Sequence, residues 1–254
     1  MSASLRTIRA LIRRALNEVV RVPGAAIPGV LAPTIFMLGL SSVFGHAAEL
    51  RGFPADSFRT YIVPVGLLQG AGFTGAATGV NLARDIEQGW FDRLLLCPAP
   101  RLTVLLGIVG SAALRGLLPG TFLFIIAMIL GVPFPGIGGL ALTILLIAGL
   151  ASSMAFFSVI VALKFRTQQA APLMQIASFS AILFTTAYAP KELLTDWLKF
   201  IATVNPVNYV LAGVRQGFIA DVTWANTWPA LLAIAGLITV FGAFATRGMR
   251  RFGS

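Results

Sequence analysis

The chain of 254 residues carries little charge for its length, since 57% of its residues are hydrophobic and only 11% are charged. A soluble domain carries about 25% charged residues, so much of this exterior is expected to face lipid. Each membrane span needs about 20 apolar residues, which leaves room for about six spans and no separate soluble domain. With one cysteine, Cys97, and one histidine, His46, neither an intrachain disulfide nor a metal cluster is predicted, and His46 is expected to be interfacial.

Residues 2–22 are predicted to form a basic amphipathic helix rather than a span. Leucine, isoleucine, valine and alanine recur there at helical spacing, and arginines occupy the other positions. Such a helix lies in the headgroup region of a bilayer. A signal peptide is the alternative, but the charged part is long, no small-residue cleavage site follows, and further spans come later.

Six apolar runs follow, and each is predicted to cross the membrane. They lie near residues 25–45, 61–82, 102–130, 138–163, 172–189 and 228–246. Several contain proline, which membrane helices tolerate because neighbouring helices satisfy the carbonyl groups that proline frees. The expected fold is an all-α integral membrane protein, with residues 1–254 forming a single transmembrane domain.

The formal charge of +10 raises nucleic acid as a partner, but the distribution of the charge gives a different explanation. With both termini and the loops 83–101 and 164–171 in the cytoplasm, thirteen of the 19 Lys and Arg residues lie on that side. This is the positive-inside pattern of a multi-pass membrane protein. Attraction to anionic lipid accounts for the charge, so no nucleic acid is predicted.

Two connections are predicted to be structured. Residues 83–101 contain both charged and large apolar groups, which is typical of a short cytoplasmic helix that binds a protein partner; a helix that only lies on the bilayer is the alternative. Residues 190–225 are expected to form two short re-entrant helices in the outer leaflet, broken at Asn205–Pro206. Arg215 is then expected near the outer headgroups, paired with Asp221 or with a lipid phosphate.

Arg115 lies inside the third apolar run and has two interpretations. It is either a counter-charge for a substrate or an arginine that extends along a long helix to the cytoplasmic interface. The second is favoured, because the predicted spans contain no acidic residue to pair with it.

Two motifs resemble those of one known family, the ABC-2 type transporter permeases, and in particular its daunorubicin-resistance branch. The first is Glu87-x-Gly89-x-x-Asp92-x-Leu94-Leu95-x-x-x-Pro98-x-x-Arg101. The second is Asn205-Pro206-Val207-Asn208-Tyr209-Val210-Leu211-Ala212-Gly213-Val214-Arg215, which is similar to the stretch before that family's last span. The order of the motifs, the chain length and the basic N-terminus also agree.

The resemblance implies a permease subunit in a bacterial plasma membrane, paired with a second permease copy or a homologous permease and with separate ATP-binding cassette subunits. The chain has no phosphate-binding loop of the Gly-x-x-x-x-Gly-Lys-Ser/Thr type, so ATP and Mg²⁺ are expected on the partner and no cofactor on this chain. The implied contact with the ATP-binding subunit is a coupling helix. Its candidate residues are Glu87, Gly89, Phe91, Asp92, Arg93, Leu95 and Pro98.

By analogy with the family's central cavity, polar and aromatic residues of the second and fifth runs are candidates for a substrate path. They are Gln69, Phe73, Thr74, Asn81, Ser178, Phe179, Thr185 and Thr186. Ordinary helix packing is the favoured alternative at each position, because Ser and Thr commonly bridge membrane helices. The branch implies export of a hydrophobic or amphipathic drug, antibiotic or glycolipid, with polysaccharide or glycoconjugate export as the alternative.

Two other classes of protein are less well supported. An ion-coupled secondary transporter is expected to carry acids or histidine in its spans and to show an internal repeat, and neither is visible. A membrane enzyme needs a cluster of acids, bases or metal ligands near the interface. The only cytoplasmic acidic cluster, at residues 85, 87 and 92, has no histidine beside it.

Overall fold

The computed structural model describes residues 3–21, 23–49, 53–96 and 99–252, and the helices dominate it. In chain order they are α1 (Ala3–Arg21), α2 (Pro23–Val43), η1 (Gly45–Glu49), α3 (Phe58–Glu87), α4 (Trp90–Leu95), α5 (Arg101–Ile129), α6 (Gly136–Phe165), η2 (Gln168–Ala170), α7 (Ala171–Leu183), η3 (Lys191–Leu193), α8 (Asp196–Val204), α9 (Pro206–Ile219) and α10 (Trp224–Arg251). No strand is present among these residues.

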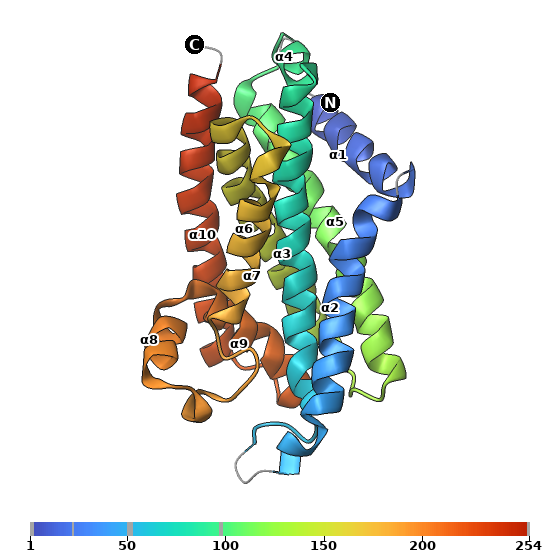
Figure 1. Cartoon of the computed structure of the whole chain (residues 1–254), viewed down its shortest axis with the longest axis vertical. Helices are drawn as coiled ribbons and strands as arrows, with labels where there is room; N and C mark the ends of the chain where they lie inside the picture. The colour runs from blue at the N-terminus through green and yellow to red at the C-terminus, as the bar shows by residue number, and fades with distance from the viewer. Residues whose placement is uncertain (1–2, 22, 50–52, 97–98, 253–254) are drawn as a thin grey trace.

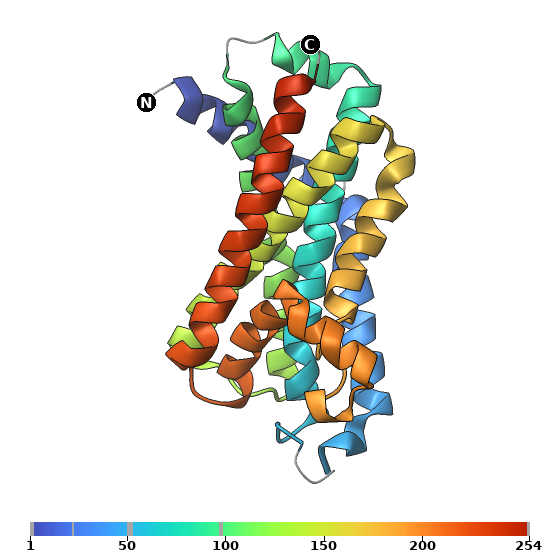
Figure 2. The same ribbon diagram turned by 90° about the vertical axis from the view of Figure 1, so that its left-hand side faces the viewer.

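The long helices run side by side as an elongated bundle (Figure 1). Both chain ends lie at one end of it, which we call the terminal end, together with α1 and α4. The opposite, distal end holds η1, α8 and α9, and the view turned by 90° shows α8 and α9 gathered there beside α10 (Figure 2). The segments expected on opposite sides of a membrane are therefore at opposite ends of the bundle.

Among the described residues, three helices are long and apolar enough to cross a membrane by length and composition: α5, α6 and α10. A shorter apolar stretch, Gly29–Val43, lies within α2. Helix α3 carries more polar residues, and α7 has only 13 residues, so it ends at Leu183 instead of reaching the predicted limit at 189. Six helices of the described residues, α2, α3, α5, α6, α7 and α10, lie along the bundle where spans were predicted. Three of them have both the length and the hydropathy of a span, and the crossing of all six stays a prediction.

Helix α3 is the centre of the bundle and packs against α2, α5, α6, α7 and α9. The approach of α3 to α6 is close enough to require glycine. A Cβ atom on Gly75 would lie 2.5 Å from the Cβ atom of Met154, and one on Gly79 would clash with Ser158. Small residues at helix contacts are how membrane helices pack without a hydrophobic driving force between them.

The outer faces of the long helices are apolar. On α5, Leu114, Leu118, Phe122, Ile125 and Ile129 are all exposed, and on α10, Leu232, Val240 and Phe244 are exposed as well. Soluble monomers rarely expose contiguous apolar surface on this scale. The same surface is compatible with the hydrocarbon core of a bilayer.

Helix α3 is longer than expected. Its N-terminus is capped by Ser57, whose hydroxyl accepts a hydrogen bond from the Thr60 amide at 3.1 Å, and the helix continues through Arg84 and Asp85 to Glu87. The prediction of a separate helix across 83–101 was therefore too broad. Within the described part of this segment, α4 alone forms a separate helix. Ion pairs to α1 neutralise Arg84 and Asp85, so α3 continues through these two residues.

Candidate functional site

Gly89 sets the direction of α4. Its φ of 66° lies in the left-handed region, which glycine adopts without strain, and this conformation turns the chain sharply after α3. The turn directs Phe91 into the bundle, where it is fully buried and packs edge-on against Phe252 with ring centroids 5.2 Å apart. Asp92 and Arg93 are exposed, Leu95 is half-buried, and Leu96 is 86% exposed.

Among the predicted coupling residues, Phe91 therefore anchors α4 to the bundle, while Asp92 and Arg93 lie on its outer face. Glu87 is the last residue of α3, and Gly89 forms the turn between the two helices. Pro98 lies outside the described residues. The exposed face of α4, which we define as Asp92, Arg93 and Leu96, combines charge with apolar surface.

Helix α1 is tied to the end of α3 by two ion pairs. The guanidinium of Arg14 donates to both carboxylate oxygens of Asp85, at 2.8 and 2.9 Å. The guanidinium of Arg84 donates to the carboxylate of Glu18. Arg14 also lies 3.6 Å above the ring of Trp90 in α4, a cation–π contact. We call these contacts the α1 latch, and through them α1, α3 and α4 are joined.

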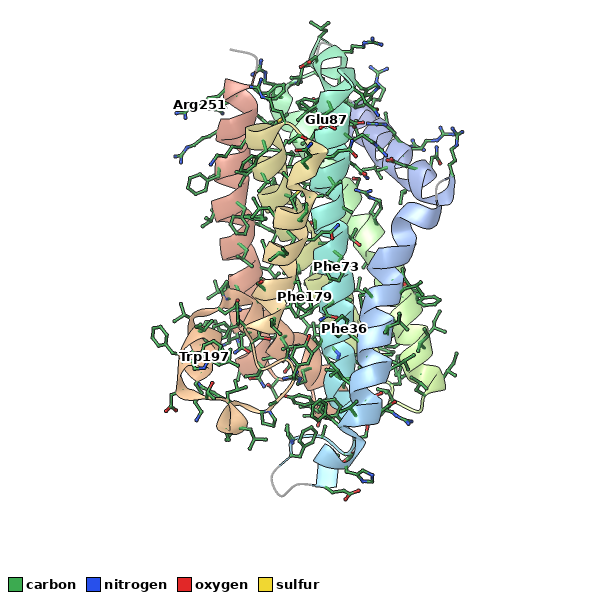
Figure 3. All side chains as sticks on the ribbon, in the orientation of Figure 1. Phe36, Phe73, Glu87, Phe179, Trp197 and Arg251 are labelled. Carbon is green, nitrogen blue, oxygen red and sulfur yellow. The ribbon has the colours of Figure 1, made fainter. Side chains whose placement is uncertain are left out.

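The residues that flank α4 in the chain, Glu87 and Arg101, also contact other parts of the bundle. The carboxylate of Glu87 accepts hydrogen bonds from the backbone amide of Gln168 at 3.1 Å and from its side chain at 2.9 Å. Hydrogen bonds from Thr167 and Gln168 lower the pKa of the Glu87 carboxyl below its ordinary value. At the start of α5, Arg101 donates to the Met249 and Arg250 carbonyls at the end of α10, at 2.9 and 2.8 Å. Figure 3 shows Glu87 and Arg251 together at this end.

Seven of the eight predicted substrate-path residues divide into three groups, and Asn81 lies apart from them. The hydroxyls of Thr74, Ser178 and Thr185 donate to carbonyls of Gly70, Met174 and Ile182, one turn back in the chain. These bonds satisfy the hydroxyls locally, as is common for Ser and Thr in membrane helices. The three hydroxyls are consistent with the packing interpretation.

An aromatic cluster is the second group. Phe73 of α3 stacks on Phe179 of α7 with ring centroids 6.4 Å apart, and Phe36 of α2 lies 6.0 Å from Phe179. The three rings meet where α2, α3 and α7 face the viewer in Figure 3. Phe36 is exposed, and Phe73 and Phe179 are half-buried, so the cluster forms part of the bundle's surface.

Gln69 and Thr186 form the third group, in which α3 and α9 contact the non-helical stretch that follows α7. Gln69 is buried and donates to the hydroxyl of Tyr188 at 2.9 Å. Thr186 donates from both its amide and its hydroxyl to Oδ1 of Asn208, each at 2.9 Å. Asn81 does not lie with the others; it lines a pocket near α1 together with Arg115.

Arg215 was placed wrongly by the sequence. It is buried, not at the outer headgroups, and its guanidinium lies 3.8 Å above the ring of Tyr61. It donates to the Thr186 carbonyl at 3.0 Å and to the Ala187 carbonyl at 3.2 Å. These two carbonyls follow the end of α7, where no helix supplies a partner, and Arg215 replaces the missing donors.

Asn205 contributes to the same junction. Its Nδ2 donates to the Ala181 and Phe184 carbonyls at 2.7 and 2.8 Å, and its Oδ1 caps α9 by accepting from the Val207 amide at 3.0 Å. We define Asn205, Asn208 and Arg215 as the distal clamp, since all three bind the backbone or side chains of residues 181–187. The Asn-Pro motif indicated a helix break, but its spacing did not reveal this function.

Helices α8 and α9 form on either side of Asn205–Pro206, where the break was predicted. They differ in burial. Trp197 and Phe200 of α8 are exposed, and Trp197 points outward in Figure 3, whereas α9 packs against α3, α6 and α10 with most of its residues buried. The second half of the segment is thus part of the core.

The favoured interpretation of Arg115, a side chain that reaches the cytoplasmic interface, is wrong, since Arg115 is buried. The residue is 7% exposed, and its guanidinium donates to the Thr78 hydroxyl at 2.8 Å. The described residues bring no three His, Cys, Asp or Glu side chains together in a way that could hold a metal ion.

A helical bundle with lipid-compatible faces and a charged knob at one end defines a multi-pass membrane protein. The comparisons with known proteins specify it further: residues 6–219 match the family described as ABC-2 type transporter. The chain therefore belongs to the ABC-2 type transporter family, and it is a membrane permease subunit of an ABC transporter.

Three relatives illustrate this membership. The inner membrane transport permease YadH of Escherichia coli K12 is 26% identical over 218 residues, covering 81% of this chain and 80% of YadH. The putative transport permease ycf38 of Cyanophora paradoxa is 23% identical over 208 residues, covering 81% and 71% of the two chains. The probable multidrug ABC transporter permease YbhR of E. coli K12 is 26% identical over 197 residues, covering 74% of this chain and 50% of YbhR.

Proposed function

We propose that the chain is the membrane half of an ATP-driven exporter, and that the exposed face of α4 docks into a separate ATP-binding subunit. The observation that carries this proposal is the position of α4. It presents Asp92, Arg93 and Leu96 outward. On its inner side, Phe91 is buried in the bundle and the ring of Trp90 lies under the guanidinium of Arg14. A force applied to α4 would be passed to α1, α3 and α10 through the contacts described above.

The family in general pairs permeases with ATP-binding subunits, which supports this assignment. Both termini and α4 are then cytoplasmic, and six helices (α2, α3, α5, α6, α7 and α10) cross the bacterial inner membrane. The terminal end carries most of the basic residues, as the positive-inside pattern requires. ATP and Mg²⁺ bind to the partner subunit, and their hydrolysis biases the permease between inward-facing and outward-facing states.

A second permease copy completes the proposed path. The aromatic cluster Phe36, Phe73 and Phe179 lies at the surface formed by α2, α3 and α7, and large apolar side chains of α7 such as Ile176 are exposed beside it. Two such faces would enclose an aromatic, weakly polar passage. That lining suits a hydrophobic or amphipathic compound, and the probable multidrug permease YbhR among the relatives is consistent with such cargo.

Transport in vesicles tests the function. The chain is reconstituted with the ATP-binding subunit that co-purifies with it, and an amphipathic fluorescent dye is supplied on the side that carries the ATPase. ATP-dependent, vanadate-sensitive movement of the dye is expected, and Phe179→Ala should lower its rate more than Phe244→Ala on the outer face of α10. Movement that follows an ion gradient without ATP would contradict the proposal.

A further inference from the structure

The function proposed above makes no use of Arg115 or of the pocket that it lines. The pocket lies between α1, α3, α4 and α5 near the terminal end, and its volume is about 50 Å³. A cavity needs only about 10–15 Å³ on this measure to hold one water molecule. Arg14 of α1 and Trp90 of α4 line one side of the pocket. Thr78 of α3 and Ser111 and Arg115 of α5 line the other.

The charges around this pocket do not balance locally. Asp85 is paired with Arg14, and Glu18 is paired with Arg84. Among the described residues, no carboxylate forms an ion pair with Arg115; Glu18 attracts it only from a greater distance, through its charge. Arg14, Arg115, Glu18 and Asp85 all line the pocket, and Arg84, the partner of Glu18, lies outside the lining. When Arg84 is counted, three guanidinium groups share two carboxylates, and one positive charge is left over.

Arg115 itself is 93% buried, because its exposed fraction is 7%. One of its terminal nitrogens donates to Thr78, but its Nε has no hydrogen-bond partner. A buried charge without a partner is strongly destabilising, so such groups are normally paired or bind a ligand. The guanidinium fork fits the oxygens of a phosphate group particularly well, since two parallel N–H groups can bind two oxygens at once.

We infer that this pocket is an anion site that takes a phosphate group, held by Arg115 with Arg14 beside it. The phosphate would supply acceptors for the unpaired Nε and cancel the excess positive charge. It would also connect α5 to α1, since Arg14 belongs to the α1 latch. Occupation of the site would therefore strengthen the attachment of α1 to the bundle.

The phosphate group could come from two sources, the headgroup of an anionic phospholipid or soluble inorganic phosphate. Helix α1 carries Arg6, Arg9 and Arg13 on an exposed basic face, which suits the surface of an anionic membrane. Since α1 also lines the pocket, a lipid phosphate bound at the level of α1 would lie close to it. The test below separates this source from the soluble one.

The full chain is placed in nanodiscs of phosphatidylcholine alone or with phosphatidylglycerol, and inorganic phosphate is added to the former in a separate series. Thermal unfolding is measured. The wild type is expected to unfold several degrees higher with one phosphate source, because a ligand that binds the folded state stabilises it. A shift with phosphatidylglycerol only identifies lipid, and a shift with inorganic phosphate identifies the soluble ion.

Arg115→Met is expected to lose the shift, and Arg9→Met, which removes the same charge from the exposed face of α1, is expected to keep it. Ala15→Leu fills the pocket from α1 without changing any charge, and it should also lose the shift; it decides the matter if Arg115→Met does not fold. The inference is overturned if neither source stabilises the wild type. It is equally overturned if Ala15→Leu and Arg115→Met respond as the wild type does.

Discussion

The two ends of the bundle are held together by different chemistry. At the terminal end, the α1 latch consists of ion pairs whose arginines are partly exposed: the side chain of Arg14 is 41% exposed and that of Arg84 is 36% exposed. At the distal end, the clamp consists of hydrogen bonds that Asn205 and Arg215 donate to backbone carbonyls of residues 181–187 and that Thr186 donates to Asn208; Arg215 is buried and the two asparagines are half-buried.

The difference has a mechanical meaning. Partly exposed ion pairs are weakened by salt and contribute about 0–1 kcal/mol each, so they can be broken and reformed at low cost. Arg215 is buried, and separating it from the carbonyls that follow α7 is costly, since each buried polar group left unsatisfied costs about 1–3 kcal/mol. We therefore expect the terminal end to rearrange during transport and the distal clamp to move as one unit with α7.

The largest expected effect is at Arg215. Replacing it in Arg215→Leu removes the donors to the Thr186 and Ala187 carbonyls and the contact with Tyr61, and should lower the free energy of unfolding by about 2–4 kcal/mol. Thermal unfolding in detergent measures the change. Arg59→Leu is the matched control, because Arg59 is exposed and makes a single long hydrogen bond of 3.4 Å. If the two variants lowered the free energy of unfolding equally, Arg215 would not stabilise the distal end as described.

A smaller loss is expected at Asn205. Asn205→Ala removes two bonds to the carbonyls at the end of α7 and the cap of α9, and should cost about 1–2 kcal/mol. Hydrogen exchange should then rise in residues 181–187 and at the start of α9 together. If only α9 were affected, Asn205 would be an ordinary helix cap and α7 would be held by other contacts.

The latch should respond more weakly and should depend on salt. Asp85→Asn leaves Arg14 without its carboxylate, and α1 amides should exchange faster than in the wild type at low salt. High salt should bring the wild type toward the variant, because screening weakens the same ion pair. Asp92→Asn removes an exposed carboxylate from α4 and should leave the exchange of α1 unchanged. A faster exchange in both variants would indicate a general effect of charge.

The smallest effect concerns Glu87. Its folded-state pKa is lowered by hydrogen bonds from Thr167 and Gln168, so its contribution is present above the unfolded pKa and is lost as pH falls through the folded pKa. The Gln168 amide should thus be protected at neutral pH and less so in acid. In Glu87→Gln this additional pH dependence should disappear. A wild-type profile identical to that of the variant would contradict the assignment.

The sequence predicted the apolar helices best where hydropathy alone decides the outcome. The runs 102–130 and 138–163 correspond closely to α5, Arg101–Ile129, and α6, Gly136–Phe165. It failed where a partner supplies the missing interaction. The charges of Arg84 and Asp85 indicated that the second span ends near residue 82, but ion pairs to α1 allow α3 to continue through them.

The same reason explains the errors at the two arginines. A charged residue in an apolar segment is expected to reach water or a headgroup, and both arginines were placed at an interface for that reason. Arg215 instead finds carbonyls that become available only because α7 ends at Leu183, six residues before the predicted limit. Arg115 finds Thr78 across the α3–α5 contact. Neither partner is adjacent in sequence, so no local pattern could have indicated it.

The central claim is that the exposed face of α4 is the docking point for the ATP-binding subunit. Leu96→Asp and Asp92→Lys change that face, and Leu193→Asp makes a matched change at the distal end, where Leu193 is 65% exposed. Each variant is purified from membranes with the ATP-binding subunit, and the ratio of the two subunits and the ATPase activity are measured. We predict that the α4 variants lose both and that Leu193→Asp keeps both; wild-type ratio and activity in the α4 variants would contradict the account.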